Sequence, residues 1–293
     1  MDTKSLQSLL SDPSHYAKAF KVFCARSAKF RVYSDWVDGV FSEAVVGKLQ
    51  ATMDGREELR VLGVGSGSGE MDCAMLEKLK RRFPRINNRV VEPSRELLGK
   101  YKALAQSKAH ELQSVECDFR QQTLEQYEKA GDATKFHFIS AVHCMYHLHD
   151  YDSSLEYLYN CLIPGGAILV IHMSENTGLS RYRTRFPCLQ PSDHNYSTSA
   201  DIRSSLDRRG IPFTQHPYPV RLDITKCFDQ ASEEGGLLLD FLTFHVNFRE
   251  TAPEDLQRSV IECFGGSDCS ERKNDAIYLI IDWDAIVISK PKH

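Results

Sequence analysis

The residues best placed to do chemistry form a glycine-rich turn that follows an apolar run. Residues 59–64 are Leu-Arg-Val-Leu-Gly-Val, and the turn after them contains Gly65, Ser66, Gly67, Ser68 and Gly69. The apolar run predicts a buried strand, and the alternating glycines predict a turn whose backbone approaches a ligand closely. Met71, Met75 and Leu79 then recur every four residues, which predicts a helix whose N-terminal amides face that ligand.

The class of ligand follows from the motif letters and from the next strand. A phosphate loop would continue with Gly-Lys-Ser/Thr, and a dinucleotide turn beginning at Gly65 would have a third glycine where Glu70 stands. A second strand, residues 88–92, ends in Glu92, whose carboxylate is suited to accept hydrogen bonds from a ribose diol. A glycine turn with a ribose-binding acid and no phosphate motif indicates S-adenosylmethionine. Close packing of the backbone is the alternative explanation for the glycines.

Composition limits the other partners. The chain has 293 residues, 42% of them hydrophobic, and its net charge of -4 comes without a long basic or acidic block. We therefore expect a small-molecule substrate, and neither a nucleic acid nor a membrane as partner. The nine cysteines are scattered, with no Cys-x-x-Cys pair, and no N-terminal stretch resembles a signal peptide. These features predict a cytoplasmic protein with reduced thiols, and we expect a monomer.

The order of the elements predicts a doubly wound, Rossmann-like α/β sheet, because strands and helices alternate from Leu59 onward. Before it, two aromatic-rich helices are expected, the first capped by Ser11 or Asp12. They either pack on the sheet or form a lid in which Tyr16 and Phe20 wall a substrate pocket. The elements expected after Glu92 are helix 94–107, strand 115–119, strand 136–143, helix 153–162, strand 167–171, a loop over 174–197, helix 199–209, strand 213–220, helices 236–244 and 254–263, and a strand or hairpin over 275–289.

Two further groups of candidate residues lie after strands. In open α/β sheets the ligand lies beyond the carboxyl ends of the strands, which makes His143 and Tyr146, after strand 136–143, candidates for the active site. Thr123 follows the strand over 115–119, where an adenine ring would be met. His147, His149 and Asp150 suggest a metal site only weakly, because Tyr151 stands where the hydrolase pattern needs an aspartate, and we expect no metal.

Longer stretches of the chain resemble a known family. A helix, Leu-x-Pro-Gly-Gly at residues 162–166 and then a strand resemble the region before the fifth strand of S-adenosylmethionine-dependent methyltransferases. Over nearly its full length the chain resembles the histamine N-methyltransferase family. The residues that carry this resemblance are Ser8-Leu9-Leu10-Ser11-Asp12, Tyr16 and Phe20, Gly65 to Glu70, Val90-Val91-Glu92-Pro93-Ser94, Leu238-Leu239-Asp240-Phe241-Leu242-Thr243 and Asn247-Phe248-Arg249-Glu250-Thr251-Ala252-Pro253.

The resemblance implies methyl transfer to a ring nitrogen of an imidazole. A neutral imidazole nitrogen already has a lone pair, so catalysis would depend on in-line positioning and on exclusion of water. Aromatic faces, Tyr146 among them, would stabilise the charge that passes to the ring. By the same resemblance Gly65, Glu92 and Val142 fall on cofactor positions, and Leu97 and Leu124 fall on cofactor positions that are polar in the family.

We expect two domains, because about fifty residues precede the first strand. Residues 1–50 would form the N-terminal helical lid. Residues 51–293 would form the methyltransferase domain, with a substrate-covering region near 174–265.

The substrate positions depart from the family pattern. The glutamate that binds the substrate ammonium falls on Lys29, an asparagine that holds substrate falls near Ile281, with Asp282 beside it, and a glutamine falls on His143. If Lys29 faces the pocket it would repel histamine and attract the carboxylate of histidine or carnosine, whereas Asp282 would still accept an amine. Alternatively, Lys29 is an exposed helix lysine, and His143 either orients the ring or only fills the strand end.

Three other functions remain as alternatives. A catalytically inactive module that binds S-adenosylmethionine would keep Glu92 and the glycine turn and lack a working acceptor pocket. A serine hydrolase with a Gly-x-Ser-x-Gly elbow is also considered, but residues 65–69 do not support it, because Gly67 stands where that elbow has its serine. A nicotinamide oxidoreductase is disfavoured by Glu70.

Overall fold

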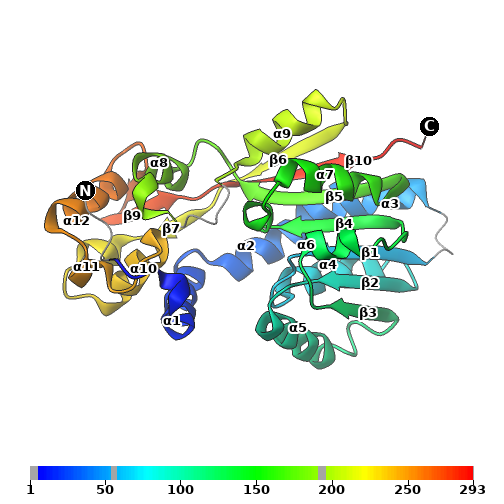
Figure 1. Cartoon of the computed structure of the whole chain (residues 1–293), viewed down its shortest axis with the longest axis horizontal. Coiled ribbons are helices and arrows are strands. Elements are labelled where there is room, and N and C mark those ends of the chain that lie inside the picture. The colour runs from blue at the N-terminus through cyan, green and yellow to red at the C-terminus, as the bar shows by residue number, and fades with distance from the viewer. Residues whose placement is uncertain (1–5, 54–57, 191–195, 293) are drawn as a thin grey trace. The chain divides into compact units, whose positions relative to one another are not determined.

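A seven-stranded sheet is the main framework among the described residues of the computed structural model, which are 6–53, 58–190 and 196–292. Its strands are β1 (Leu59–Val64), β2 (Ile86–Val91), β3 (Val115–Arg120), β4 (Phe136–Val142), β5 (Leu162–Met173), β6 (Phe213–Tyr218) and β10 (Trp283–Ser289). Their order across the sheet is β3-β2-β1-β4-β5-β10-β6 (Figure 1). The pairs β3/β2, β2/β1, β1/β4 and β4/β5 are parallel, as the alternation of strands and helices predicts.

The register of the parallel strands brings their carboxyl ends to one edge. Val64, the last residue of β1, pairs with Val91 of β2 and with Ala141 of β4. Because the strand order reverses between β1 and β4, this edge is the topological switch point at which ligands bind in such sheets. The glycine turn, Glu92 and His143 all follow strands that end there.

Helices cover both faces of this sheet. On one face Tyr127 of α6, Leu158 of α7 and Leu206 of α9 share a buried apolar core with inward-facing strand residues. On the other face Phe41 packs against Phe138 of β4, with ring centroids 5.7 Å apart. The helices of the first face are α6 (Leu124–Lys129), α7 (Tyr151–Asn160) and α9 (Ser199–Arg208), and α4 (Glu70–Lys80) and α5 (Arg95–Ser107) follow β1 and β2.

The N-terminal region confirms Asp12, one of the two predicted cap residues, and contains more helical segments than the two predicted. Asp12 caps α1 (Pro13–Arg26), and its Oδ1 accepts a hydrogen bond from the amide of His15 at 2.9 Å. The chain then continues as α2 (Lys29–Trp36), a π-helical segment over Val37–Val46 and α3 (Gly47–Thr52).

The chain divides into two compact units, each built from separate stretches. Unit 1 comprises residues 1–32, 173–194 and 218–283, and unit 2 comprises 33–172, 195–217 and 284–293. These boundaries differ from the 1–50 and 51–293 division expected from the sequence, because unit 2 already includes residues 33–50. The role of residues 1–50 as a lid stays a prediction.

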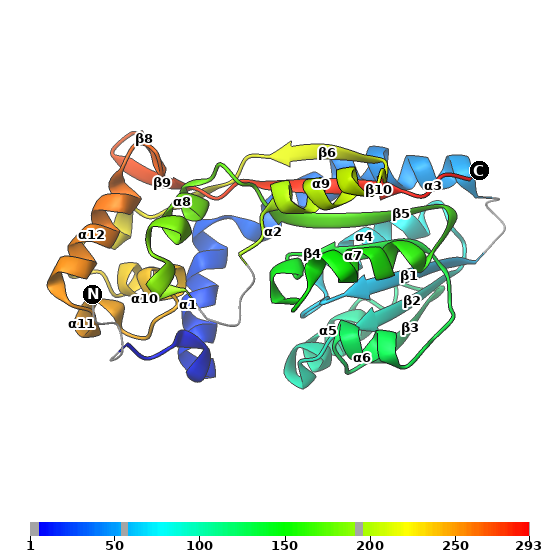
Figure 2. The same ribbon diagram turned by 45° about the horizontal axis from the view of Figure 1, so that its top comes forward.

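Unit 1 has its own sheet and its own core. Its strands β7 (Arg221–Asp223), β9 (Ala276–Ile280) and β8 (Ser270–Lys273) form an antiparallel sheet in that order. The remaining helices are α8 (Gly178–Arg185), α10 (Glu233–Thr243), α11 (Phe248–Thr251) and α12 (Glu254–Gly265). Helix α8 lies against both α12 and β9 (Figure 2), and Tyr182, Leu239 and Phe264 are among the fully buried residues of this core.

Three local expectations were wrong. The stretch 174–197, expected to be a loop, contains α8, which Thr177 caps and which begins where Gly178 packs against the backbone of Cys269. Residues 191–195 of that stretch lie outside the described residues. The expected strand or hairpin over 275–289 is two strands in different sheets, interrupted at Asp282, whose side chain accepts a hydrogen bond from the amide of Val220. Finally, Pro164 and the two glycines after it belong to β5, where the pairing with β4 shifts register.

Candidate active site

The glycine turn is fixed by backbone geometry. Gly65, Gly67 and Gly69 all have positive φ, at 58°, 57° and 84°, a region that side chains disfavour. A Cβ at Gly65 would lie 2.5 Å from Cβ of Cys144, and one at Gly69 would lie 2.2 Å from the ring of Tyr101. At Gly67, by contrast, the space in front of the backbone is open. The turn therefore packs tightly against the protein at two glycines and offers its backbone to a ligand at the third.

Glu92 lies beside this turn. Its side chain is buried, its Oε2 accepts a hydrogen bond from the amide of Gly67 at 2.9 Å, and its Oε1 accepts one from the amide of Ser94 at 2.8 Å. The amide of Gly65 in turn donates to the carbonyl oxygen of Val91 at 2.9 Å. The two predicted features, glycine turn and acid, are thus brought together by the β1/β2 pairing, and Glu92 is held in one orientation by two amides.

Asp72 is a third component of this region, which the sequence analysis missed. It lies in the first turn of α4 and is only 6% exposed, and a Cβ at Gly63 would be 2.4 Å from its Oδ2. Burial raises the pKa of Asp72 to about 6, although hydroxyl groups of Ser66, Tyr101 and Ser140 lower it. The sequence does contain an indication that Asp72 is buried, because Asp72 lies at helical spacing from buried residues that follow it on α4.

His143 and Tyr146 lie just beyond the end of β4. His143 has a φ of 50°, which is uncommon for a residue with a side chain, and its amide donates to the carbonyl oxygen of Ile171 at 2.9 Å. The ring of Tyr33 stacks on the His143 ring with centroids 6.0 Å apart. Tyr146 stacks on His172, which is fully buried, at 5.8 Å. Both predicted residues are therefore anchored by aromatic neighbours at the switch-point edge.

The remaining predicted cofactor residues occupy nearby strand ends and helix starts. Val142 ends β4, and Leu97 lies in the first turn of α5, where its amide donates to Oγ of Ser94 at 3.3 Å. Thr123 caps α6 and forms a capping box with Gln126. The side chain of Leu124 is buried in the sheet core, so only its backbone is available for a ligand.

The predicted substrate residues near the N-terminus form an aromatic cluster in unit 1. Rings of Tyr16 and Phe20 stack with centroids 5.9 Å apart, and Phe241 lies 5.7 Å from Phe20. The Nζ atom of Lys29 lies 4.7 Å from the centroid of the Phe20 ring, a cation–π distance, and Lys29 is partly buried. Lys29 is therefore not a freely solvated helix lysine.

Ile281 and Asp282 lie between β9 and β10. Asp282 forms an ion pair with Arg221, and its Oδ1 also accepts the amide of Val220 at 2.7 Å. Ile281 packs at the border of the unit 1 core. Since Arg221 already neutralises the charge of Asp282, this carboxylate attracts a substrate amine less strongly than an unpaired carboxylate would.

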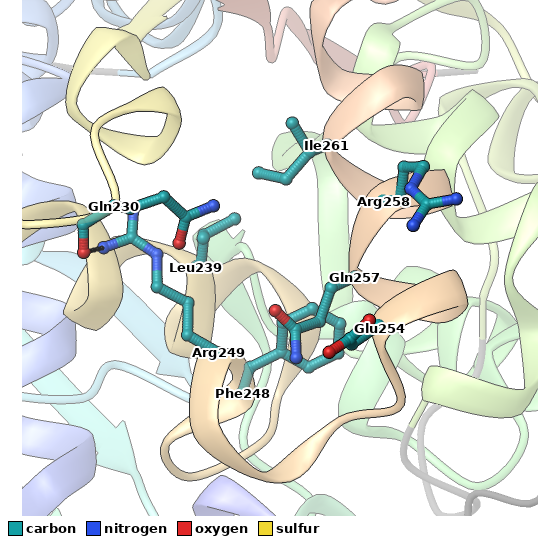
Figure 3. Close-up of a pocket in the computed structure, with 8 residues that line it drawn as sticks. All are labelled: Gln230, Leu239, Phe248, Arg249, Glu254, Gln257, Arg258 and Ile261. Atoms are coloured by element: carbon teal, nitrogen blue, oxygen red, sulfur yellow. Dashed lines mark hydrogen bonds between the residues drawn. The ribbon is translucent and has the colours of Figure 1, made fainter.

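A separate hollow of about 270 Å³ lies in unit 1 (Figure 3). Its lining consists of Gln230, Leu239, Phe248, Arg249, Glu254, Gln257, Arg258 and Ile261, none of which was predicted as a site residue. Arg249 donates to the carbonyl oxygens of Ser232 at 2.8 Å and Cys227 at 2.9 Å. This arginine, part of a family-specific stretch, therefore links α11 to the segment before α10.

Neither a metal cluster nor a membrane span is found in the part of the chain that the structure describes. No group of three His, Cys, Asp or Glu side chains there could hold a metal ion. Asp150 of the considered metal motif instead caps α7, accepting the amides of Asp152 and Ser153. The described helices are too short or too polar to cross a bilayer.

Comparison with known proteins agrees with the fold and the turn. A family described as "Methyltransferase domain" matches residues 31–215. The YcgJ protein of Bacillus subtilis aligns with a TM-score of 0.54 at 16% identity, covering 86% of this chain and all of that one. The plantazolicin methyltransferase BpumL, solved with S-adenosylhomocysteine (SAH), aligns with a TM-score of 0.50 at 14% identity, covering 96% and 92% of the two chains. The fold and the glycine turn define a class I methyltransferase that uses S-adenosylmethionine.

Curated relatives narrow the family. Histamine N-methyltransferase of Xenopus tropicalis is 32% identical over 97% of this chain and 98% of that protein. Carnosine N-methyltransferase 2 of Gallus gallus is 30% identical over 97% of this chain and 88% of that protein. The chain belongs to the histamine N-methyltransferase family, and it is a small-molecule N-methyltransferase.

Proposed function

We propose that this enzyme methylates a ring nitrogen of an imidazole, and that it prefers imidazoles that carry a carboxylate, such as histidine or carnosine, to histamine. The observation that carries the preference is Lys29, whose ammonium group lies against the aromatic cluster of Tyr16 and Phe20. A cation at this place attracts a substrate carboxylate and repels a substrate ammonium. One curated relative bears the name carnosine N-methyltransferase, which supports an acceptor of this kind.

In this proposal the aromatic rings of Tyr16 and Phe20 bind the imidazole by its faces. The stacked pair is partly buried, and burial raises the pKa of the Tyr16 phenol, so this hydroxyl stays neutral at physiological pH. Electron-rich ring faces stabilise the positive charge that the imidazole gains when its nitrogen takes the methyl group. Ile281 adds apolar contact, and Asp282 contributes as a hydrogen-bond acceptor whose charge is balanced by Arg221.

His143 and Tyr146 would orient the acceptor at the end of β4. The strained backbone of His143, with a φ of 50°, projects the residue from the edge where the cofactor turn lies. His143 is proposed to hold the acceptor ring by a hydrogen bond, and Tyr146 to present its ring to the developing charge. No metal or strong base is needed, since the neutral imidazole already carries its lone pair.

The cofactor would be held by the backbone of the turn and by the groups around it. The sulfonium donor supplies the electrophilic methyl group. Glu92 would accept hydrogen bonds from the ribose, and Gly67 would offer its backbone to the amino-acid end. Gly65, Ser66 and Gly69 would fix the bend of the turn around Gly67, and Val142, Leu97, Thr123 and Leu124 would border the adenine. The open space at Gly67, beside a buried Glu92, fits such a ligand.

An acceptor panel tests this function. Purified protein is incubated with S-adenosylmethionine and, separately, with histamine, histidine, carnosine and a primary amine without an imidazole. Mass spectrometry should detect one added methyl group on the carboxylate-bearing imidazoles, and NMR should place it on a ring nitrogen. Methylation of the side-chain amine, or a clear preference for histamine, would contradict the proposal. Calorimetric binding of the cofactor without turnover of any acceptor would instead support the inactive binding module.

A further inference from the structure

The Asp72 carboxylate is surrounded by hydroxyl groups from three segments, one of them the glycine turn itself. Ser66 lies in the turn itself, Ser140 on β4 and Tyr101 on α5, and each contributes a hydroxyl group that lowers the pKa of Asp72. The Oη atom of Tyr101 is 3.4 Å from Oδ2 of Asp72 and also receives a hydrogen bond from the side-chain amide of Asn88 at 3.3 Å. The carboxylate is thus held in one place by groups that favour its charged form.

This charge has a second carboxylate as its neighbour. Glu92 is 5% exposed and raises the pKa of Asp72 by electrostatic repulsion. Among the described residues, neither Asp72 nor Glu92 forms an ion pair with a Lys, Arg or His side chain. Two buried carboxylates of this kind are costly unless a cation approaches them. The turn therefore has a local excess of negative charge where the cofactor binds.

The thiols and the phenol that face Asp72 remain neutral near pH 6. Burial raises the pKa of Cys73 and of Cys144 to about 12, and it also raises those of Cys117 and Tyr101 above their ordinary values. None of these groups adds charge between pH 5 and 7. Asp72, with a pKa of about 6, changes its charge within that interval.

We propose that Asp72 is a specificity-determining residue whose carboxylate lets the cofactor site bind the sulfonium donor more tightly than the thioether product. S-Adenosylmethionine carries one positive charge more than S-adenosylhomocysteine, and the charge is on sulfur. Unit charges about 10 Å apart at an effective dielectric constant near 20 change a binding constant roughly tenfold. A tenfold difference in affinity favours binding of S-adenosylmethionine and release of S-adenosylhomocysteine. This inference depends on cofactor binding and is independent of the acceptor.

Binding experiments without any acceptor test the proposal. Isothermal titration calorimetry at pH 7 compares wild type and Asp72→Asn with S-adenosylmethionine, S-adenosylhomocysteine and an analogue in which a charged amine replaces the methylsulfonium. We expect the variant to lose affinity for the two cationic ligands about tenfold and for S-adenosylhomocysteine less than threefold. Equal losses for all three ligands would show a purely structural role and overturn the proposal, as would no loss at all.

A matched control removes a carboxylate elsewhere in unit 2. Asp152 pairs with Arg209 at 2.6 Å on the surface. Asp152→Asn therefore changes the net charge as much as Asp72→Asn does, and it should leave the ratio of the affinities for S-adenosylmethionine and S-adenosylhomocysteine unchanged. A similar change of ratio in this control would assign the effect to net charge and contradict the proposal.

The wild-type protein provides a test that does not depend on folding of a variant. As the pH falls from 7 to 5, Asp72 becomes protonated, and the preference for S-adenosylmethionine over S-adenosylhomocysteine should decrease severalfold. Tyr101→Phe removes a hydroxyl group that faces Asp72, so the midpoint of this decrease should move to higher pH. A preference that stays constant from pH 7 to 5 would refute the role of Asp72, whatever the acceptor panel shows.

Discussion

The glycine turn of unit 2 and the aromatic cluster of unit 1 are built in different ways. The turn is defined by its backbone: its glycines have positive φ angles, the amide of Gly67 donates to Glu92, and there is no space for a Cβ at Gly65 or Gly69. The cluster consists of side chains, the rings of Tyr16 and Phe20 and the ammonium of Lys29. A binding site made of backbone atoms tolerates few substitutions, whereas a binding site made of side chains can change its ligand through a single substitution. The two regions therefore constrain function to different degrees.

The relatives illustrate this difference. Proteins named for histamine and for carnosine match the chain about equally well, at 32% and 30% identity over nearly its full length. Overall similarity thus identifies the reaction class without separating the acceptors. We expect the choice of acceptor to rest on a few side chains, and Lys29, which the resemblance places where the family has a glutamate, is the first of them to test.

The largest expected effect follows from adding a single methyl group to the turn. Gly65→Ala forces a Cβ to within 2.5 Å of Cys144 at a φ of 58°, so the turn must shift. We expect calorimetry to show at least a hundredfold weaker binding of S-adenosylmethionine, and denaturation to show a loss of about 2 kcal/mol. Gly99→Ala is the control, because Gly99 lies in α5 with open space around it and alanine favours helix by about 1 kcal/mol. Normal cofactor binding by Gly65→Ala would refute the view that the turn is a backbone site.

A smaller effect, on the acceptor alone, is expected from reversing one charge in unit 1. Lys29→Glu should lower kcat/KM for carnosine and histidine about tenfold and raise it for histamine by a similar factor, since the charge facing the substrate changes sign. Initial rates measured with each acceptor at saturating cofactor check this. Affinity for S-adenosylmethionine should change less than twofold. Lys18→Glu, at an exposed position of α1, is the matched control. An unchanged order of acceptors would remove Lys29 from substrate recognition.

The smallest effect concerns the stability of β4, which leads to the cofactor edge. His137 is buried and its Nδ1 accepts the amide of Arg60 at 2.9 Å, and burial lowers the pKa of His137 to about 4. In the unfolded chain His137 binds a proton near pH 6.5, whereas in the folded chain it does so only near pH 4. The free energy of unfolding therefore falls as the pH drops from 6.5 toward 4. His137→Gln keeps an acceptor and removes this proton. We expect its melting temperature to fall a few degrees less than that of wild type between pH 7 and 5.

Parallel melting curves at both pH values would contradict this role for His137. Asp72 has a raised pKa, so its own contribution to stability increases as the pH falls, opposite to that of His137. Because Asp72 is present in wild type and in His137→Gln, its contribution cancels when the two proteins are compared.

The parallel sheet and the glycine turn were predictable from sequence, because their signals are local. Apolar runs, glycine spacing and the acid after β2 predicted β1, β2 and the turn, and Asp12 predicted the start of α1. The family resemblance predicted the reaction class, which the relatives confirm. These features depend either on residues that are close together in the chain or on the order and spacing of the elements along it.

The features that escaped prediction depend on distant partners. Asp282 ends β9 through Val220 and Arg221, about sixty residues earlier, so no local pattern separates β9 from β10. Helix α8 depends on Gly178 packing against Cys269, and its own eight residues are mostly polar. The helical spacing of Asp72 indicates that it lies on the buried face of α4, but only the fold shows that it faces the glycine turn. In each case the missing information is tertiary.

The position of β10 has a consequence for how the protein is made. This strand lies between β5 and β6, yet it is formed by residues 283–289. The ribosome must therefore reach β10 before the sheet can be completed, and the edge of β5 that β10 covers stays unpaired while more than a hundred further residues are translated. We expect nascent chains to need shielding by a chaperone until late in synthesis.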